Sequence, residues 1–329
     1  ANNQPIYLKM YEGDYANLIL AKVNIEGKFE WIRNLGGGQG TIQSLDINDN
    51  GEIFAHSNHG GNIHISAEDT IDNVGVNFNI IGHWDVGVYK FNSDGLYIDG
   101  MTIGSTGYDE FKKVIATTDG GCLFVGTLLG EATIPASDTV NNSDITFGCD
   151  VYSAAVIKIN SDNKVEWVNN IKTDLNIGME NCEEIENGKY IVFGGYKTKE
   201  QGIIPAEETV NNTEIILTGE QNILVTYNAD GLIENVEFET GEMFITEKID
   251  NETFTFDYDY GTTVINKYDE DKSLAWTSKI GIYAKKVVKA ENGDYIIGGT
   301  ITREGTIAAE NTVLGENIAI QKFGYGSDI

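Results

Sequence analysis

The sequence predicts an all-β protein assembled from repeated four-stranded antiparallel units. Three observations support this class: a segment that returns at a constant interval, short apolar runs that alternate with turn residues, and only three prolines. The repeated segment first occurs as Asn24-Ile-Glu-Gly-Lys-Phe-Glu-Trp31. Its marker glycine and the equivalents follow at steps of 68, 68, 68 and 41 residues: Gly27, Gly95, Asn163, Gly231 and Lys272. A constant step indicates stacked copies of one unit that cannot bury its apolar face alone.

The order of elements inside a unit follows from its turns. In the unit that begins near residue 42, the runs 42–48 and 52–57 flank Asp49-Asn50-Gly51, and the runs 86–92 and 96–103 flank Ser93-Asp94-Gly95. Asn-Gly and Asp-Gly turns are typical of β-hairpins. Each unit is therefore expected to contain two hairpins, and central strands without proline agree with this.

Four-stranded sheets that repeat radially form a β-propeller, a ring that protects its strand edges. Four complete units span about residues 41–280, which leaves an N-terminal piece (6–35) and a C-terminal piece (284–323). If the two pieces share one blade, the ring has five blades; if each forms its own blade, it has six. We expect five, within a single domain over residues 1–329 that is closed by strands from both termini. The run 18–24 has no place in that assignment.

A second phrase recurs between the second and third strands of several units. Its copies share a leading alanine and a closing Thr-Ile or Thr-Val pair: Ala67–Ile71, Ala136–Val140, Ala206–Val210 and Ala309–Val313. A further β run follows the first three copies, so each insertion is expected to be a small hairpin on the face that carries the loops between blades. Two roles stay open, a binding surface and a stiffened rim.

Each unit also carries the pattern Asn-x-Asp-Gly-x-x-x-Trp or a variant of it, with Gly-Gly segments and turns such as Asp119-Gly120-Gly121. In these features, over nearly its whole length, the chain resembles the bacterial β-propeller repeat family of secreted and cell-surface proteins. Asp99 and Asn235 depart from the pattern by replacing the Trp. The resemblance implies adhesion or recognition, and the motif itself contains no catalytic residue.

Charge and composition narrow the function classes. The chain has 22 Lys and Arg against 51 Asp and Glu, a formal net charge of −29, which disfavours binding to nucleic acid or to anionic membrane surfaces. No apolar run approaches the roughly 20 residues that a membrane span needs. The polar start Ala1-Asn-Asn-Gln-Pro resembles that of a mature product, so we expect a secreted or surface-displayed bacterial protein.

Catalytic signatures are weak. A sialidase propeller needs a cluster of arginines, and Arg33 and Arg303 are the only two in the sequence. A glycosidase needs only a pair of suitably spaced carboxylates, which 51 acidic residues neither identify nor exclude. We therefore favour a non-catalytic module that binds a glycan or a protein. A glycan-active hydrolase with axial carboxylates and a structural spacer of a surface assembly are the alternatives.

Metal binding is an open alternative, with no cofactor predicted. All four histidines, His56, His59, His64 and His83, fall in one unit near Asp69 and Asp85, a set whose donors suit zinc. Acidic loops at 257–259 and 269–271 suit calcium. A metal site needs several ligands that converge on one point, so isolated loop side chains are the competing interpretation.

The candidate ligand contacts are residues that the loop-bearing face is expected to expose. They are Gln39, His59, His64, Trp84, Tyr108 and Asp109. Aromatic and polar side chains on loops that a rigid ring supports are typical of recognition surfaces. No catalytic residue is predicted.

Overall fold

The computed structural model describes residues 6–8, 17–37, 39–172, 176–186, 188–198, 202–239, 253–259, 262–268, 274–280, 283–290, 293–301 and 305–307. In these ranges the protein is all-β, as predicted, with several four-stranded antiparallel sheets. Helical structure in the same ranges is confined to three short 3-10 turns, η1 (Ala67–Asp69), η2 (Ala136–Asp138) and η3 (Ala206–Glu208). None of the helical segments described could span a membrane.

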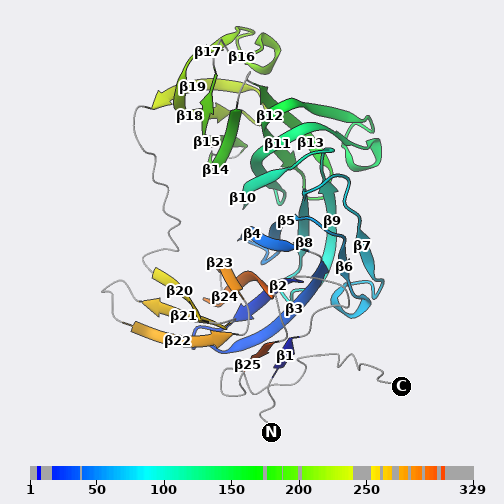
Figure 1. The fold of residues 1–329 in the computed structure, drawn as a ribbon, viewed down its shortest axis with the longest axis vertical. Helices are drawn as coiled ribbons and strands as arrows, with labels where there is room; N and C mark the ends of the chain where they lie inside the picture. The colour runs from blue at the N-terminus through cyan, green and yellow to red at the C-terminus, as the bar shows by residue number, and fades with distance from the viewer. Residues whose placement is uncertain are drawn as a thin grey trace.

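Five sheets account for most of the described strands, and we number them by their order along the arc in Figure 1. Sheet 1 contains β23 (Tyr283–Lys289), β24 (Tyr295–Ile301), β2 (Asn17–Val23) and β3 (Phe29–Gly37). Sheet 2 contains β4 (Gly40–Ile47), β5 (Ile53–His59), β8 (Asp85–Phe91) and β9 (Tyr97–Ile103). Sheet 3 contains β10 (Glu110–Ala116), β11 (Cys122–Ile134), β12 (Ile145–Ile159) and β13 (Val165–Lys172).

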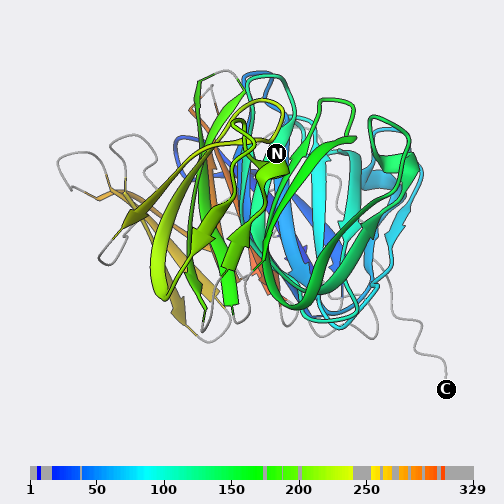
Figure 2. The same cartoon turned by 90° about the horizontal axis from the view of Figure 1, so that it is seen from above.

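Sheet 4 contains β14 (Asn176–Glu186), β15 (Lys189–Lys197), β18 (Glu220–Tyr227) and β19 (Ile233–Glu239). Sheet 5 contains β20 (Thr253–Asp259), β21 (Thr262–Tyr268) and β22 (Leu274–Ile280). A separate pair joins β1 (Ile6–Leu8) to β25 (Gly305–Ile307). The arc runs from sheet 5 through sheets 1, 2 and 3 to sheet 4 (Figure 1), and the view from above shows neighbouring sheets standing side by side (Figure 2).

The repeated asparagine explains the hairpin turn of each unit. Asn92 accepts hydrogen bonds at its side-chain oxygen from the backbone N–H groups of Asp94 (3.0 Å) and Leu96 (2.8 Å). Gly95 follows with a φ of 73°, a left-handed conformation that glycine adopts without steric cost. The side chains at Asn24, Asn160 and Asn228 bond in the same way. A local side-chain bond therefore fixes the turn before any long-range contact forms.

Sheet 1 combines strands from distant parts of the chain. β2 pairs with β24 on one side, through Ala21 and Ile297, and with β3 on the other. The run 18–24, which the five-blade assignment leaves unplaced, is thus the third strand of this sheet. The run 317–323, which that assignment used as the third strand, lies outside the described residues.

The predicted insertions form hairpins, two of which extend a neighbouring sheet. The hairpin of β6 (Ile63–Ile65) and β7 (Val76–Phe78) leaves sheet 2 and pairs with β3 of sheet 1 through Gly36 and Gly37. The hairpin of β16 (Gly202–Ile204) and β17 (Ile215–Leu217) leaves sheet 4 and pairs with β13 of sheet 3.

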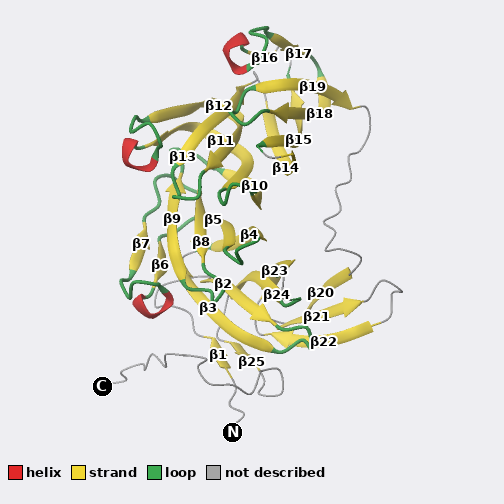
Figure 3. Ribbon diagram, turned by 180° about the vertical axis from the view of Figure 1, so that it is seen from behind, coloured by secondary structure: helices red, strands yellow, loops and turns green. Residues whose placement is uncertain are grey.

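In sheet 3 the insertion instead prolongs β11 and β12. Figure 3 shows the three 3-10 turns at the tips of these hairpins. The hairpins therefore extend the sheets, as the rim interpretation expects, and a binding role for them stays a prediction. The fourth copy of the phrase, at 309–313, lies outside the described residues.

Tryptophan side chains link neighbouring sheets. Three of them, each on the outer strand of one sheet, lie against the glycine in the last turn of the next: Trp31 on Gly95, Trp167 on Gly231, and Trp276 on Gly27. A Cβ atom built on these glycines would lie 2.7, 2.4 and 2.9 Å from the respective indole rings. Only glycine leaves room for such a contact.

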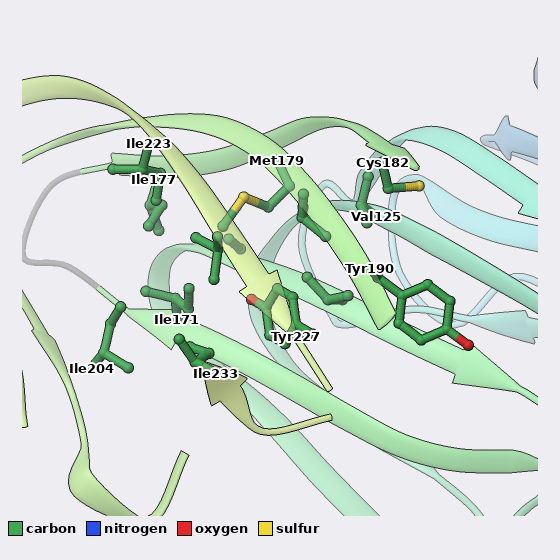
Figure 4. Packing of buried hydrophobic residues seen from close by; sticks show 14 of the residues in the cluster. Val125, Ile171, Ile177, Met179, Cys182, Tyr190, Ile204, Ile223, Tyr227 and Ile233 are labelled. Atoms are coloured by element: carbon green, nitrogen blue, oxygen red, sulfur yellow. The ribbon is translucent and has the colours of Figure 1, made fainter. Parts of the chain in front are cut away.

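Apolar side chains fill the spaces between consecutive sheets. One cluster joins sheets 3 and 4 through residues such as Val125, Ile171, Met179 and Tyr227, which point toward one another in Figure 4. Comparable clusters lie between sheets 1 and 2 and between sheets 2 and 3. All three cysteines are free thiols, and Cys122 is fully buried. Burial raises the pKa of Cys122 to about 12, which suppresses thiolate reactivity.

Candidate binding site

Five of the six predicted contact residues lie along one edge of sheets 2 and 3. Gly40, which follows Gln39, pairs with His59 at the end of β5, and His59 pairs with Asp85 at the start of β8. Trp84 precedes β8, and Tyr108 and Asp109 precede β10. β5 ends at this edge, and β8 and β10 begin there. The loops at the edge are therefore supported by the strands of both sheets.

Backbone hydrogen bonds join the loop before β8 to the loop before β10. The N–H groups of His83 (3.1 Å) and Trp84 (3.4 Å) both donate to the carbonyl of Gly107. In return the N–H of Asp109 donates to the carbonyl of Trp84 at 3.0 Å. Trp84 and Tyr108 also form a parallel bridge. The two loops therefore form one unit across the junction of sheets 2 and 3.

An aromatic patch, formed by His83, Trp84 and Tyr108, lies on this unit. The rings of His83 and Tyr108 stack at a centroid distance of 5.4 Å with an interplanar angle of 9°. Tyr108 is 52% exposed and His83 is exposed as well. Trp84 is half-buried and packs over Gly60, where an added Cβ would lie 3.2 Å from the indole. The patch thus presents flat apolar surface on a rigid support.

Asp109 lies beneath the patch and is only 1% exposed. Its carboxylate accepts hydrogen bonds from the N–H (2.5 Å) and hydroxyl (2.8 Å) of Ser105 and from the N–H of Leu129 (3.1 Å). Burial raises the pKa of Asp109, and these hydrogen bonds offset part of the increase. The side chain therefore positions the loop and lies away from the surface where a ligand would bind.

Asp85 supports the other loop in the same way. It is fully buried, and its carboxylate accepts hydrogen bonds from the N–H groups of Ile81 and Gly82. Gly104 packs directly on this carboxylate, since an added Cβ there would overlap it. Asp85, the first residue of β8, and Asp109, the residue before β10, therefore hold their two loops in equivalent ways.

His59 is fully buried below this edge. Its Nδ1 donates to the carbonyl of Gly61 at 2.8 Å, so Nε2 carries a lone pair, and no partner for it occurs among the described residues. Burial lowers the pKa of His59, so the ring is neutral at pH 7. Like Asp109, it is a support of the edge and lies below its exposed surface.

Gln39 and His64 differ in their relation to the patch. Gln39 is exposed, has a φ of 58°, and accepts a hydrogen bond at its carbonyl from Gly60 at 3.2 Å. Since Gly60 lies under Trp84, Gln39 borders the patch. His64 lies on β6, pairs with Gly36 of sheet 1, and bonds to Asn77 at 2.7 Å. The structure therefore separates His64 from the other candidates.

The histidines do not converge on a metal site. Nε2 of His56 bonds to the carbonyl of Phe111, while His59, His64 and His83 have the separate partners given above. Within the described ranges, no group of three or more His, Cys, Asp or Glu side chains could hold a metal ion. The loop 269–271 lies outside these ranges, and calcium binding there stays a prediction.

The sequence signal for the patch was incomplete. The sequence indicated His83 as a possible metal ligand and assigned no contact in a binding site to Ser105, Gly107 or Gly60. The run Gly104-Ser-Thr-Gly107 before Tyr108 was the available signal, because small residues permit the close approach of two loops. Comparisons with known proteins add no relative: no family model matches the chain, and no curated protein matches it.

Proposed function

We propose that this protein is a non-catalytic, five-bladed propeller module that binds a neutral glycan at the aromatic patch. The observation that carries the proposal is the exposed, stacked pair of His83 and Tyr108 on two loops that hydrogen-bond to each other. A pyranose has one face of C–H groups, and such a face packs on a tyrosine or indole ring while its hydroxyls bond to polar groups beside the ring.

Preorganisation supports a binding role for the patch. Side chains that are already ordered lose little conformational entropy on binding, and each ordered side chain would otherwise cost about 0.5–1.5 kcal/mol. The stack, the three backbone hydrogen bonds and the two buried aspartates hold the patch in one arrangement.

The net charge of the protein favours neutral glycans over acidic ones. The formal net charge of −29 produces a negative potential around the whole molecule. Sialic and uronic acids would be repelled by it, so neutral sugars are favoured.

The carboxylates at this edge favour binding over hydrolysis. A glycosidase needs an acid and a second carboxylate that both reach the scissile bond, about 5–9.5 Å apart. Asp85 and Asp109 are buried, and backbone or hydroxyl donors occupy their oxygens. Neither is free to act on a substrate. Family membership and surface display stay predictions from the sequence.

The test is a glycan array that contains neutral and acidic glycans, probed with the purified protein and with the Tyr108→Ala variant. We expect neutral hits that lose at least tenfold in affinity in Tyr108→Ala. Phe238→Ala is the matched control, because Phe238 is an exposed aromatic (45%) of sheet 4 that contacts Tyr196 edge-on. Circular dichroism would verify that both variants fold.

Three outcomes would overturn the proposal. Equal loss in both variants would mean that the patch is not the site. Cleavage of a bound glycan, seen by product analysis, would identify a hydrolase. Absence of any hit with the wild type would favour a protein partner or a spacer.

A further inference from the structure

One face of sheet 4 carries apolar side chains that the described chain covers only in part. Phe193 of β15 pairs with Leu224 of β18, so both side chains lie on one face, together with Ile191 two residues away. All three are half-buried. Val192 and Val225, on the opposite face, are fully buried against sheet 3. The sheet is therefore apolar on both faces but packed on one.

The equivalent positions in the other sheets are fully covered. Leu224 corresponds by strand register to residues that are at most 1% exposed: Leu20, Val88, Val156 and Ile265. Ile191 corresponds to residues that are also at most 1% exposed: Phe54, Leu123 and Ile296. In sheets 1, 2 and 3, the covering element is the next sheet along the arc. The sequence retains apolar residues at the same positions of sheet 4, as a packed face requires.

The outer strand of sheet 4 shows the same difference. Glu237 is exposed, whereas its counterparts Asn169 and Ser278 are each 1% exposed. Asn235 is likewise exposed at the position where Trp31, Trp167 and Trp276 contact the next sheet.

We propose that this face of sheet 4 is the docking surface for sheet 5 of the same chain. Sheet 5 is the next unit in sequence and lies at the other end of the arc (Figure 1). Its outer strand already contacts sheet 1 through Trp276 and Gly27, in the same head-to-tail relation that joins sheets 1 and 2 and sheets 3 and 4. The opposite face of sheet 5 is therefore the one that meets sheet 4. A head-to-tail contact that repeats with a fixed rotation closes into a ring.

This contact lacks the two devices that fasten sheet 1 to sheet 2 and sheet 3 to sheet 4, namely the Trp–Gly contact and the hairpin that pairs with the neighbouring sheet. Asn235 replaces the tryptophan, and Lys272 replaces the turn glycine that would receive it. Only two residues separate β20 from β21, so sheet 5 has no inserted hairpin to pair with β19. The junction of sheets 4 and 5 is consequently held by apolar packing.

Cysteine pairs test the docking directly. In a Cys149→Ser background, which leaves only the buried Cys122 and Cys182, the variant Asn235→Cys with Lys272→Cys would be treated with a short bis-maleimide. The matched control is Asn235→Cys with Asp94→Cys, since Asp94 occupies the last turn of sheet 2, away from sheet 4. We expect an intramolecular cross-link at least tenfold faster than in the control pair.

A second measurement does not depend on the cross-linker. Thiol labelling of Leu224→Cys should be at least tenfold slower than that of Ile216→Cys, because sheet 5 would cover the first and not the second, which is 39% exposed on β17. Equal labelling rates would overturn the proposal. So would a cross-link that forms between two molecules, since it would mean that sheet 5 of a second copy occupies the face, or a cross-link no faster than the control. None of these results depends on glycan binding at the aromatic patch.

Discussion

The indole of Trp31 covers Gly95 so closely that no side chain fits between them. Arg33, two residues further along β3, donates to the carbonyls of Asp94 (2.7 Å) and Gly95 (3.1 Å) on the same turn. The outer strand of sheet 1 therefore holds the last turn of sheet 2 through one apolar and two polar contacts.

The first prediction concerns Gly95→Ala. The substitution adds a Cβ at a φ of 73° and 2.7 Å from Trp31, so both backbone strain and overpacking oppose it. We expect a loss of about 2–4 kcal/mol in the free energy of unfolding, measured by chemical denaturation. Gly51→Ala is the control, because Gly51 has a φ of 75° but its nearest neighbour is Ser93 at 3.4 Å. It should lose only about 1 kcal/mol. Similar losses would show that the Trp31 contact adds nothing.

The second prediction concerns the junction of sheets 2 and 3, which lacks this contact. Asp99 occupies the tryptophan position, and Asn163, with a φ of 57°, occupies the glycine position. Asp99→Trp alone should not stabilise the protein, because the side chain of Asn163 stands where the ring would lie. Combined with Asn163→Gly, it should do so, with a coupling energy of about 1–2 kcal/mol in a double-mutant cycle. Additive effects would contradict the proposed pairing of these positions.

The third prediction concerns Asp119, which accepts a hydrogen bond from the buried Lys158 at 2.7 Å. Burial acts to raise the pKa of Asp119, but hydrogen bonds from Lys158, Thr117 and Gly121 outweigh it, and the net pKa is lowered. A carboxyl with a lowered pKa stabilises the fold above its unfolded pKa of about 3.9, and this contribution disappears as the pH falls through the folded pKa.

The free energies of unfolding of wild type and Asp119→Asn should therefore differ at pH 6–7 and converge below about pH 4. The difference should not exceed about 1 kcal/mol, since the Asp119 side chain is 47% exposed. In a Lys158→Met background the difference should shrink. A difference that persists in acid would exclude the ion pair as its cause.

The fourth prediction concerns His59. Because burial lowers its pKa, the unfolded chain takes up a proton near pH 6.5 that the folded protein does not accept. The neutral ring therefore contributes stability above about pH 6.5, and this contribution declines as the pH falls below that value. Denaturation between pH 7 and pH 5 should show a steeper loss of stability in the wild type than in His59→Leu. Equal slopes would remove His59 from this pH dependence.

Local residue patterns predicted the hairpins well. The Asn-to-glycine turns depend on bonds within five residues, as at Asn92 and Gly95, so their sequence signal is complete. Partners across the chain were harder to predict. The pairing of β2 with β24 depends on residues at opposite ends of the described chain, and nothing in the run 18–24 itself identifies that partner.

At the aromatic patch, too, the sequence predicted the local features but not the tertiary contacts. The sequence predicted that Trp84 and Tyr108 lie on the same loop-bearing face, but not that they are neighbours, and the structure brings them together. The sequence could not distinguish an exposed Asp109 from a buried one, because burial depends on how the loop before β10 folds over Leu129. The sequence also gives no sign that His64 lies apart from the other candidates, because the pairing of β6 with β3 of sheet 1 is a tertiary contact.

Sheet 1 cannot be completed during synthesis until β24, which pairs with β2, has been made. A ribosome makes β2 and β3 before sheets 2, 3 and 4 and makes β24 after them, at about 5–20 residues per second. Until β24 emerges, one edge of β2 has no strand to pair with, whereas sheets 2 and 3 can form from contiguous sequence. The nascent chain therefore carries an unpaired strand edge while sheets 2, 3 and 4 are made, and such an edge is open to aggregation and to chaperones.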